Sequence, residues 1–338
     1  MTNTNLAFGN DLSGLICAYR FDHEGCGLSL DATGVATWME GKADTLAGEF
    51  VWLHFNLSNS SSEKWLHRQL NLPDEFYEAV REGTRSTRIE YADDSLIAVL
   101  NDVLYDFTFD ASDISTLYLW VSPRVLVSAR SKPLRSVDLL RGAVRSGEQF
   151  RSPVELLIHL LHDEGDVLVK IVRDVARQVD EVEDGLIAGR VEGKRGQLGN
   201  LRRLLVRLQR LLAPEPGALF RLLNRPPTWM ARHDLQELRQ STEEFATVLQ
   251  DMASLQERIK LLQEEIAAEI NEQNNRSLFV LTIVSVLALP INIIAGLLGM
   301  NVGGVPLAQE PNGFWIIVGV IAVFTAAAAT WAFRGKRE

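Results

Sequence analysis

One side of an otherwise apolar stretch near the C-terminus is polar. Between Leu278 and Leu298 the sequence has no charged residue. Steps of three and four residues, which keep side chains on one face of a helix, select mostly polar or small residues there. This polar face comprises Asn275, Leu278, Thr282, Ser285, Leu289, Asn292, Gly296 and Gly299. Amide and hydroxyl groups can hydrogen-bond the water shell of a cation but are poor direct ligands for zinc. Such a face could meet water or a close helix neighbour.

A stripe of small and polar residues also suits helix–helix packing in a membrane. We therefore keep two interpretations of the polar face: a packing seam, and the wall of a pore built from several copies of the helix. In the pore, Leu278, Leu281 and Leu289 are candidates for narrow apolar gates. The other sides of the helix, with residues such as Phe279 and Ile294, suit lipid or apolar neighbours.

A short motif, Gly299-Met300-Asn301, closes this stretch and continues as VGGVP over 302–306. Glycine lets the backbone turn sharply, and carbonyl groups at a helix C-terminus carry partial negative charge toward an arriving cation. An ordinary glycine-terminated helix end is the simpler interpretation. In this position, however, the motif resembles that of the CorA superfamily of divalent-cation channels and transporters. Its continuation resembles the ZntB zinc-transporter branch.

The resemblance implies an N-terminal α/β domain, a long stalk helix and a homopentamer around the first membrane span. It implies that Gly299, Met300 and Asn301 form an outer ring where Asn301 contacts the first hydration shell of an arriving ion. The transported ion would be Zn²⁺, with or without proton coupling, and no resident cofactor is expected. A channel for Mg²⁺, Co²⁺ or Ni²⁺ is the alternative within the superfamily. A membrane-anchored metal sensor or scaffold is the alternative of a different class.

Two apolar runs near the C-terminus predict a hairpin of membrane spans. The second run covers 314–333, and no Lys or Arg occurs between Ser277 and Phe333. Basic residues flank the pair at Arg276 and in the tail RGKRE. By the positive-inside rule both termini are cytoplasmic and the intervening loop faces outward. The resemblance to the CorA superfamily implies that the membrane is a bacterial inner membrane. Glu310, the only charged residue of that loop, is a weak candidate for attracting cations.

The fold class expected is an α+β membrane protein. Alternating β-branched or aromatic runs at 15–21, 51–57, 95–101, 116–122 and 124–130 predict strands, and 62–70 and 72–83 predict helices. A Ser152–Pro153–Glu155 cap opens a long helix; a second ends at Pro214, and a third extends from Thr228 to Gly299 with a heptad-like apolar stripe. The expected segments are a cytoplasmic α/β domain (1–150), a stalk (151–277), a first span (278–299), a loop (300–313), a second span (314–333) and a basic tail (334–338).

Other features of the sequence bear on metal binding and on the class of protein. His159, His162 and Asp163 are weak candidates for a cytoplasmic metal site. The acidic run of Asp180, Glu181, Glu183 and Asp184 is expected to be a solvated face or an ion-pair surface for Arg202, Arg203 and Arg207 on the following helix; attraction of cations to the cytoplasmic side is the alternative. The formal charge of −10 argues against a nucleic-acid partner. The sequence lacks a dinucleotide-binding fingerprint, a P-loop and a nucleophile elbow, so it predicts no enzyme. The expected partners are further copies of the chain, membrane lipids and metal cations.

Overall fold

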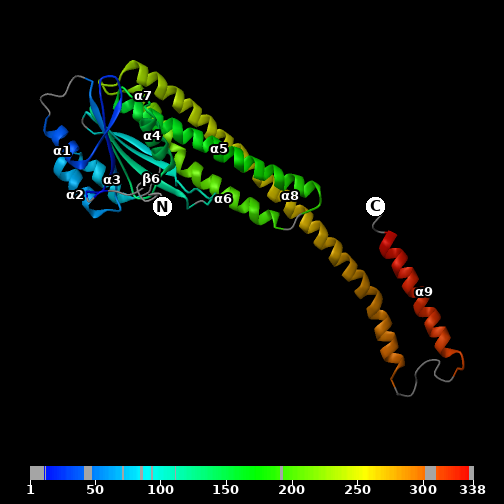
Figure 1. Cartoon of the computed structure of the whole chain (residues 1–338). Helices are drawn as coiled ribbons and strands as arrows, with labels where there is room; N and C mark the ends of the chain where they lie inside the picture. Colours follow the sequence, from blue (N-terminus) through cyan, green and yellow to red (C-terminus); the bar gives the residue numbers. More distant parts are fainter. Residues whose placement is uncertain are drawn as a thin grey trace. The chain divides into compact units, whose positions relative to one another are not determined.

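The computed structural model describes residues 11, 13–41, 48–70, 72–83, 87–92, 94–110, 112–190, 193–300 and 310–334. The chain divides into two compact units, Met1–Leu262 and Gln263–Glu338. Helix α8 (Arg232–Leu298) contributes to both of them. Figure 1 follows the chain from the sheet through the long helices to α9 (Gly313–Arg334).

The first unit is built on a seven-stranded mixed sheet. Its spatial order is β2-β1-β3-β7-β6-β5-β4, and only the β3–β7 pair is parallel. Every residue of the β5 and β7 sequences SLIAVLNDV and VLVSAR is buried, as expected for strands covered on both faces. The strands are β1 (Leu15–Phe21), β2 (Gly27–Leu30), β3 (Phe50–Asn56), β4 (Arg88–Ala92), β5 (Ser95–Val103), β6 (Ile114–Val121) and β7 (Val125–Arg130).

All five predicted strands are present, whereas β2 and β4 were not predicted. Both missed strands lie at the edges of the sheet and have only 4 and 5 residues. In β2 no residue is buried, and β4 buries only Ile89 and Ala92. Neither strand therefore produces the run of apolar residues that marks a central strand.

Helices cover both faces of the sheet. One face carries α1 (Ala32–Glu40), α2 (Ser60–Gln69) and α3 (Asp74–Glu82), which bury Val35, Leu66 and Phe76 against it. The other carries α4 (Arg135–Ser146), the first turns of α5 (Pro153–Ile187), α7 (Pro214–Asn224) and the beginning of α8. The sheet is therefore buried between two helical layers, and the expected α+β fold class is confirmed.

The long helices begin and end close to where the sequence signals predict. The Ser152 hydroxyl accepts a hydrogen bond from the Glu155 N–H at 3.0 Å, which confirms the predicted cap of α5. Helix α6 (Lys194–Leu212) stops before Pro214, which begins α7. Helix α8 begins at Arg232 rather than Thr228, and it continues through Pro290 to Leu298.

Within the first unit, α8 buries a seam of residues spaced by three or four. This spacing is the signature of coiled-coil packing. The heptad stripe predicted from the sequence contained only about half of the seam, and Leu249 from that stripe is half-buried. The seam comprises Leu238, Thr242, Phe245, Val248, Met252, Leu255, Ile259 and Leu262.

The acidic run of α5 has an arginine partner on α8. The Arg258 Nη1 atom of α8 lies 2.7 Å from Asp180 Oδ1, and its other terminal nitrogen pairs with Glu183. Asp180 and Glu183 therefore pair with an arginine of α8, which the sequence did not predict, and both acids are largely solvated. A pairing of this run with the arginines of α6 stays a prediction.

Replacing Arg258 by methionine is expected to lower the free energy of unfolding by less than about 1 kcal/mol. Side chains of this triad are 41–55% exposed, so water screens the ion pairs, and methionine keeps the apolar stem. Lys260→Met, which removes an exposed ion pair with Glu257, is the matched control. Chemical denaturation at low and high salt measures both; a loss above about 2 kcal/mol for Arg258→Met alone would contradict the expectation.

Candidate functional site

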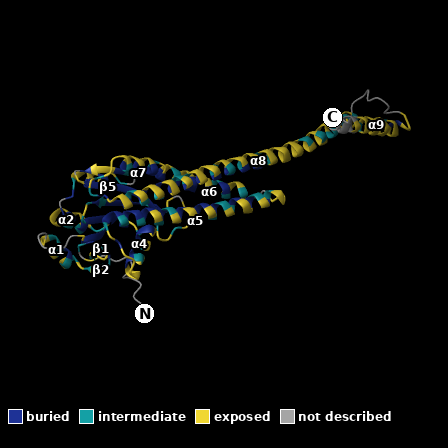
Figure 2. Cartoon of the chain, turned by 90° about the horizontal axis from the view of Figure 1, so that it is seen from above, coloured by how far each residue is buried: buried dark blue, intermediate teal, exposed yellow. Residues whose placement is uncertain are grey.

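The polar face of α8 is exposed along its whole length in the second unit. All eight of its residues, from Asn275 to Gly299, are exposed. Figure 2 colours most of this part of α8 as exposed. At about 100° per residue, all but one of the partly covered side chains between Phe279 and Leu298 fall on roughly the opposite side of the helix; the exception is Ala288, beside the polar face. The others are Phe279, Ile283, Leu287, Pro290, Ile291, Ile294 and Leu298. The polar face is therefore available to water or to another copy of the chain.

Backbone and hydroxyl chemistry along α8 adds acceptor oxygens. The Thr282 hydroxyl donates its proton to the Leu278 carbonyl at 2.8 Å, so its own oxygen keeps lone pairs for an outside donor such as ion-bound water. Pro290 has no N–H, so the Val286 carbonyl lacks the donor that an α-helix ordinarily supplies. Both effects favour hydrated cations over anions.

The end of α8 exposes further carbonyl groups. The Gly299 N–H donates to the Ala295 carbonyl at 3.0 Å, and the Met300 N–H lies 3.5 Å from the Leu297 carbonyl oxygen. The last carbonyls of a helix carry about half a negative charge in total. Asn301 and the VGGVP segment lie outside the described residues. Glu310 is exposed, and its predicted role in attracting cations stays a prediction.

Among the residues that the structure describes, α8 is the one helix long and apolar enough to cross a membrane. Helix α9 (Gly313–Arg334) matches the predicted second apolar run as a helix. Its described apolar part, Gly313–Ala327, is shorter than a full span. The hairpin of two spans therefore stays a prediction for α9.

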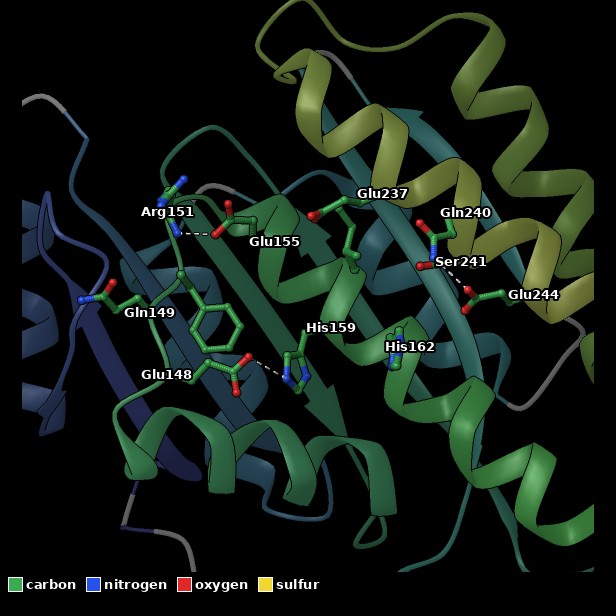
Figure 3. A pocket seen from close by; sticks show the side chains of 12 residues that line it. Glu148, Gln149, Arg151, Glu155, His159, His162, Glu237, Gln240, Ser241 and Glu244 are labelled. Carbon is green, nitrogen blue, oxygen red and sulfur yellow. Dashed lines mark hydrogen bonds and ion pairs between the residues drawn. The ribbon is translucent and has the colours of Figure 1, made fainter.

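A groove of about 570 Å³ in the first unit contains the predicted metal candidate His159. Its imidazole lies between two carboxylates. Nδ1 is 3.0 Å from Asp163 Oδ2, and Nε2 is 3.3 Å from Glu148 Oε1, a contact that Figure 3 shows as a dashed line. Burial alone would lower the pKa of His159, but the hydrogen bond and charge of Asp163, with Glu148, outweigh burial and raise it. This arrangement favours the imidazolium, which cannot bind a metal.

His162 lines the same groove. In the described part of the chain, no three ligand atoms within 4.8 Å of one another include His159, His162 or Asp163. A metal site on these three residues stays a prediction.

Two buried carboxyl groups were missed in the sequence. Glu164 of α5 and Glu215 of α7 are 2% and 0% exposed. Within the described residues, Glu164 Oε1 and both Glu215 carboxyl oxygens lack a hydrogen-bond partner. By contrast, the buried Asp102 of β5 accepts hydrogen bonds from the Ser136 N–H (2.9 Å) and the Ser136 hydroxyl (2.6 Å). Because Ser136 lies in the first turn of α4, the Asp102 carboxylate caps that helix. The signal available in the sequence was the position of Glu164, midway between apolar pairs that face the core.

Burial raises the pKa of Glu215 to about 8, and it raises the pKa of Glu164 well above its usual value. The charges of Glu215 and Asp102 add to the shift of Glu164. Burial therefore favours the protonated form of both carboxyl groups in the folded protein.

The uncharged 278–298 segment of α8 is long enough to span a bilayer, and its exposed polar face fits a membrane transporter of cations. Residues 47–334 match the family model described as CorA-like Mg²⁺ transporter protein. The chain therefore belongs to this family of divalent-cation transporters, and the resemblance identified from the motif is confirmed.

Individual relatives match nearly the whole chain. It is 28% identical to the divalent cation transporter CmaX of Pseudomonas aeruginosa, over 97% of each chain. It is 24% identical to the zinc transport protein ZntB of Yersinia pseudotuberculosis, over 96% of each. The solved structure of full-length CmaX superposes with a TM-score of 0.80 at 28% identity, covering 98% of this chain and 100% of that one.

Proposed function

We propose that this chain takes up Zn²⁺ across the bacterial inner membrane through a central pore of a homo-oligomer, with five copies by resemblance to the superfamily. Both termini lie in the cytoplasm, α8 lines the pore, and α9 forms the second span. Gly299, Met300 and Asn301 form the outer mouth. Lipid contacts are made by the apolar sides of α8 and α9.

The observation that carries this proposal is the exposed polar face of α8. An apolar helix that merely anchored the chain would need no aligned Asn, Thr, Ser and Gly residues. The face has no charge, and all but one of the partly covered residues lie on the other side of the helix. Several copies arranged around an axis would bring these side chains together around water.

The ion crosses with most of its water. Moving a bare divalent cation into a low-dielectric environment costs many kcal/mol, because the penalty is already several kcal/mol for each singly charged ion. The polar face has no carboxylate, imidazole or thiolate to replace the lost water. Rings of Asn275, Thr282, Ser285 and Asn292 hold the hydrated ion weakly, which also lets it leave. Leu278 and Leu289 form the narrow apolar gates between these rings.

Uptake is the favourable direction for a passive pore. An inside-negative potential of 100 mV favours inward movement of a divalent cation by about 4.6 kcal/mol, twice the value for a single charge. The span has no ionisable residue, so any proton coupling must involve the cytoplasmic unit, the outer loop or water around the ion.

The choice of Zn²⁺ is supported by the ZntB relatives and by the VGGVP continuation of the motif. Mg²⁺ is the second candidate, because the family description names it. Co²⁺ and Ni²⁺ are also divalent, so like Zn²⁺ and Mg²⁺ they need a path that keeps most of their water.

Flux into liposomes that contain only this protein tests the proposal. Zn²⁺, Mg²⁺, Co²⁺ and Ni²⁺ are supplied separately, with and without a pH gradient. Zn²⁺ flux is expected, and Thr282→Val should reduce it several-fold because the variant removes the acceptor oxygen but keeps the shape. Thr325→Val is the matched control, since the Thr325 hydroxyl of α9 makes the same 2.8 Å bond to its own helix.

The outcomes separate the candidates. Mg²⁺ flux with little Zn²⁺ flux would assign the protein to the alternative within the superfamily. Equal losses in the two threonine variants would contradict the assignment of the pore to the polar face. No flux of any ion from assembled oligomers would favour the anchored sensor or scaffold.

A further inference from the structure

A set of metal-type ligands lies in the first unit, away from the polar face of α8. One ligand atom each from Glu155, His233 and Asp234 lie within 4.8 Å of one another. Glu155 belongs to the first turn of α5, whereas His233 and Asp234 belong to the first turn of α8. The set thus joins two helices whose starting points are about 80 residues apart in the sequence.

One hydroxyl group links the first turn of α5 to the Asp234 carboxylate of α8. The Ser152 Oγ atom accepts a hydrogen bond from the Glu155 N–H at 3.0 Å and lies 3.2 Å from Asp234 Oδ2. The same hydroxyl therefore caps α5 and donates to the acid of α8. Asp234 is only 5% exposed, so its carboxylate is held by packing as well as by this bond.

The imidazole is also oriented by a neighbour. His233 Nε2 lies 3.4 Å from Glu237 Oε1, one turn further along α8. Second carboxylates of this kind orient metal-bound histidines through the other ring nitrogen. One oxygen of the Glu155 carboxylate accepts a hydrogen bond from the Arg151 N–H at 2.5 Å.

The local charge favours a cation despite the two helix N-termini. Each N-terminus contributes about half a positive charge, whereas the two carboxylates contribute two negative charges, which leaves about one negative charge. A tetrahedral zinc site with bonds of about 2.0–2.2 Å has ligand atoms about 3.3–3.6 Å apart. The ligand atoms now lie within 4.8 Å of one another. Rotation of the exposed His233 side chain can bring them to the shorter distances of a zinc site.

We propose that Glu155, His233 and Asp234 bind one Zn²⁺ per protomer, with water as a fourth ligand, and that the ion fastens the first turn of α5 to the first turn of α8. An imidazole with two carboxylates selects zinc over magnesium, since Mg²⁺ prefers oxygen ligands in octahedral geometry. This site is separate from the pore of the proposed function, which uses no imidazole.

Binding to the full chain in detergent tests the site. Wild-type protein is titrated with ZnCl₂ in millimolar Mg²⁺, and bound zinc per protomer is measured together with the midpoint of thermal unfolding. Co²⁺ added instead should give the visible absorption of a four-coordinate ion. One equivalent of tight Zn²⁺ and a raised unfolding midpoint are expected.

Two variants and two controls identify the ligands. His233→Ala and Glu155→Gln should each weaken this zinc binding at least tenfold and remove the Co²⁺ signal. His23→Ala is matched to His233→Ala, because these side chains are 69% and 68% exposed and each lies beside a glutamate. Glu243→Gln, on the exposed side of α8, is matched to Glu155→Gln.

Several results would overturn the site: no tight zinc in wild type, unchanged binding in both ligand variants, or equal losses in the controls. Liposome flux of His233→Ala keeps this inference distinct from the proposed function. The variant should still transport Zn²⁺, because His233 lies outside the membrane span. If no protein, wild type or variant, transported Zn²⁺ while wild type still bound one tight zinc ion, the proposed function would be refuted and the zinc site would stand.

Discussion

Replacement of Asn301 by alanine is expected to reduce the initial rate of Zn²⁺ uptake into liposomes by more than about tenfold, equivalent to about 1.4 kcal/mol in the barrier. Helix α8 ends at Leu298, and the Gly299 and Met300 N–H groups turn back onto the Ala295 and Leu297 carbonyls. Asn301 follows this turn directly. Its amide is proposed to contact the water shell of the arriving ion, and alanine cannot replace that contact.

The control for Asn301→Ala is Asn312→Ala, an exposed asparagine at the other end of the same loop. Membrane insertion and oligomer size are measured for both variants, so that loss of flux is not confused with loss of assembly. Equal flux from Asn301→Ala and wild type would remove the motif from the pore. Loss of flux in both variants would indicate a general effect of the loop.

Replacement of Glu215 by glutamine is expected to flatten the pH dependence of stability between about pH 4.5 and pH 8. The native pKa of Glu215, about 8, lies above the unfolded value. Its contribution is therefore fully present below the unfolded pKa and is lost as the pH rises through the folded one. Each pKa unit corresponds to about 1.4 kcal/mol, so the wild type loses several kcal/mol across this range.

The midpoint of thermal unfolding of the full chain, measured from pH 4.5 to 8.5, tests this. The buried amide of Glu215→Gln introduces two donors, which cost about 1–3 kcal/mol if unpaired, so the slope with pH is compared rather than stability at one pH. Glu164→Gln should flatten the curve in the same way, and the exposed Glu243→Gln should not. Identical slopes in wild type and both buried variants would mean that these carboxyls are already ionised in the folded protein.

Much of the architecture followed from local patterns. The five apolar strands, the Ser152 cap and the long helix through Pro290 were predictable because apolar spacing, capping residues and prolines act over a few neighbouring residues. The short edge strands β2 and β4 were not, because edge strands need few apolar residues. The family was recognisable because its motif stands at one place, immediately after the first apolar run.

The sequence by itself determined the uncharged stretch from Leu278 to Leu298 and the residues that share its polar face. Only the tertiary structure showed that Arg258 pairs with Asp180 and Glu183 of α5, that Glu164 and Glu215 are buried, and that Glu155 meets His233 and Asp234. A helical face depends on residues three or four apart, which the sequence displays directly. Contacts between α5, α7 and α8 depend on how distant segments pack, and no local pattern contains that information.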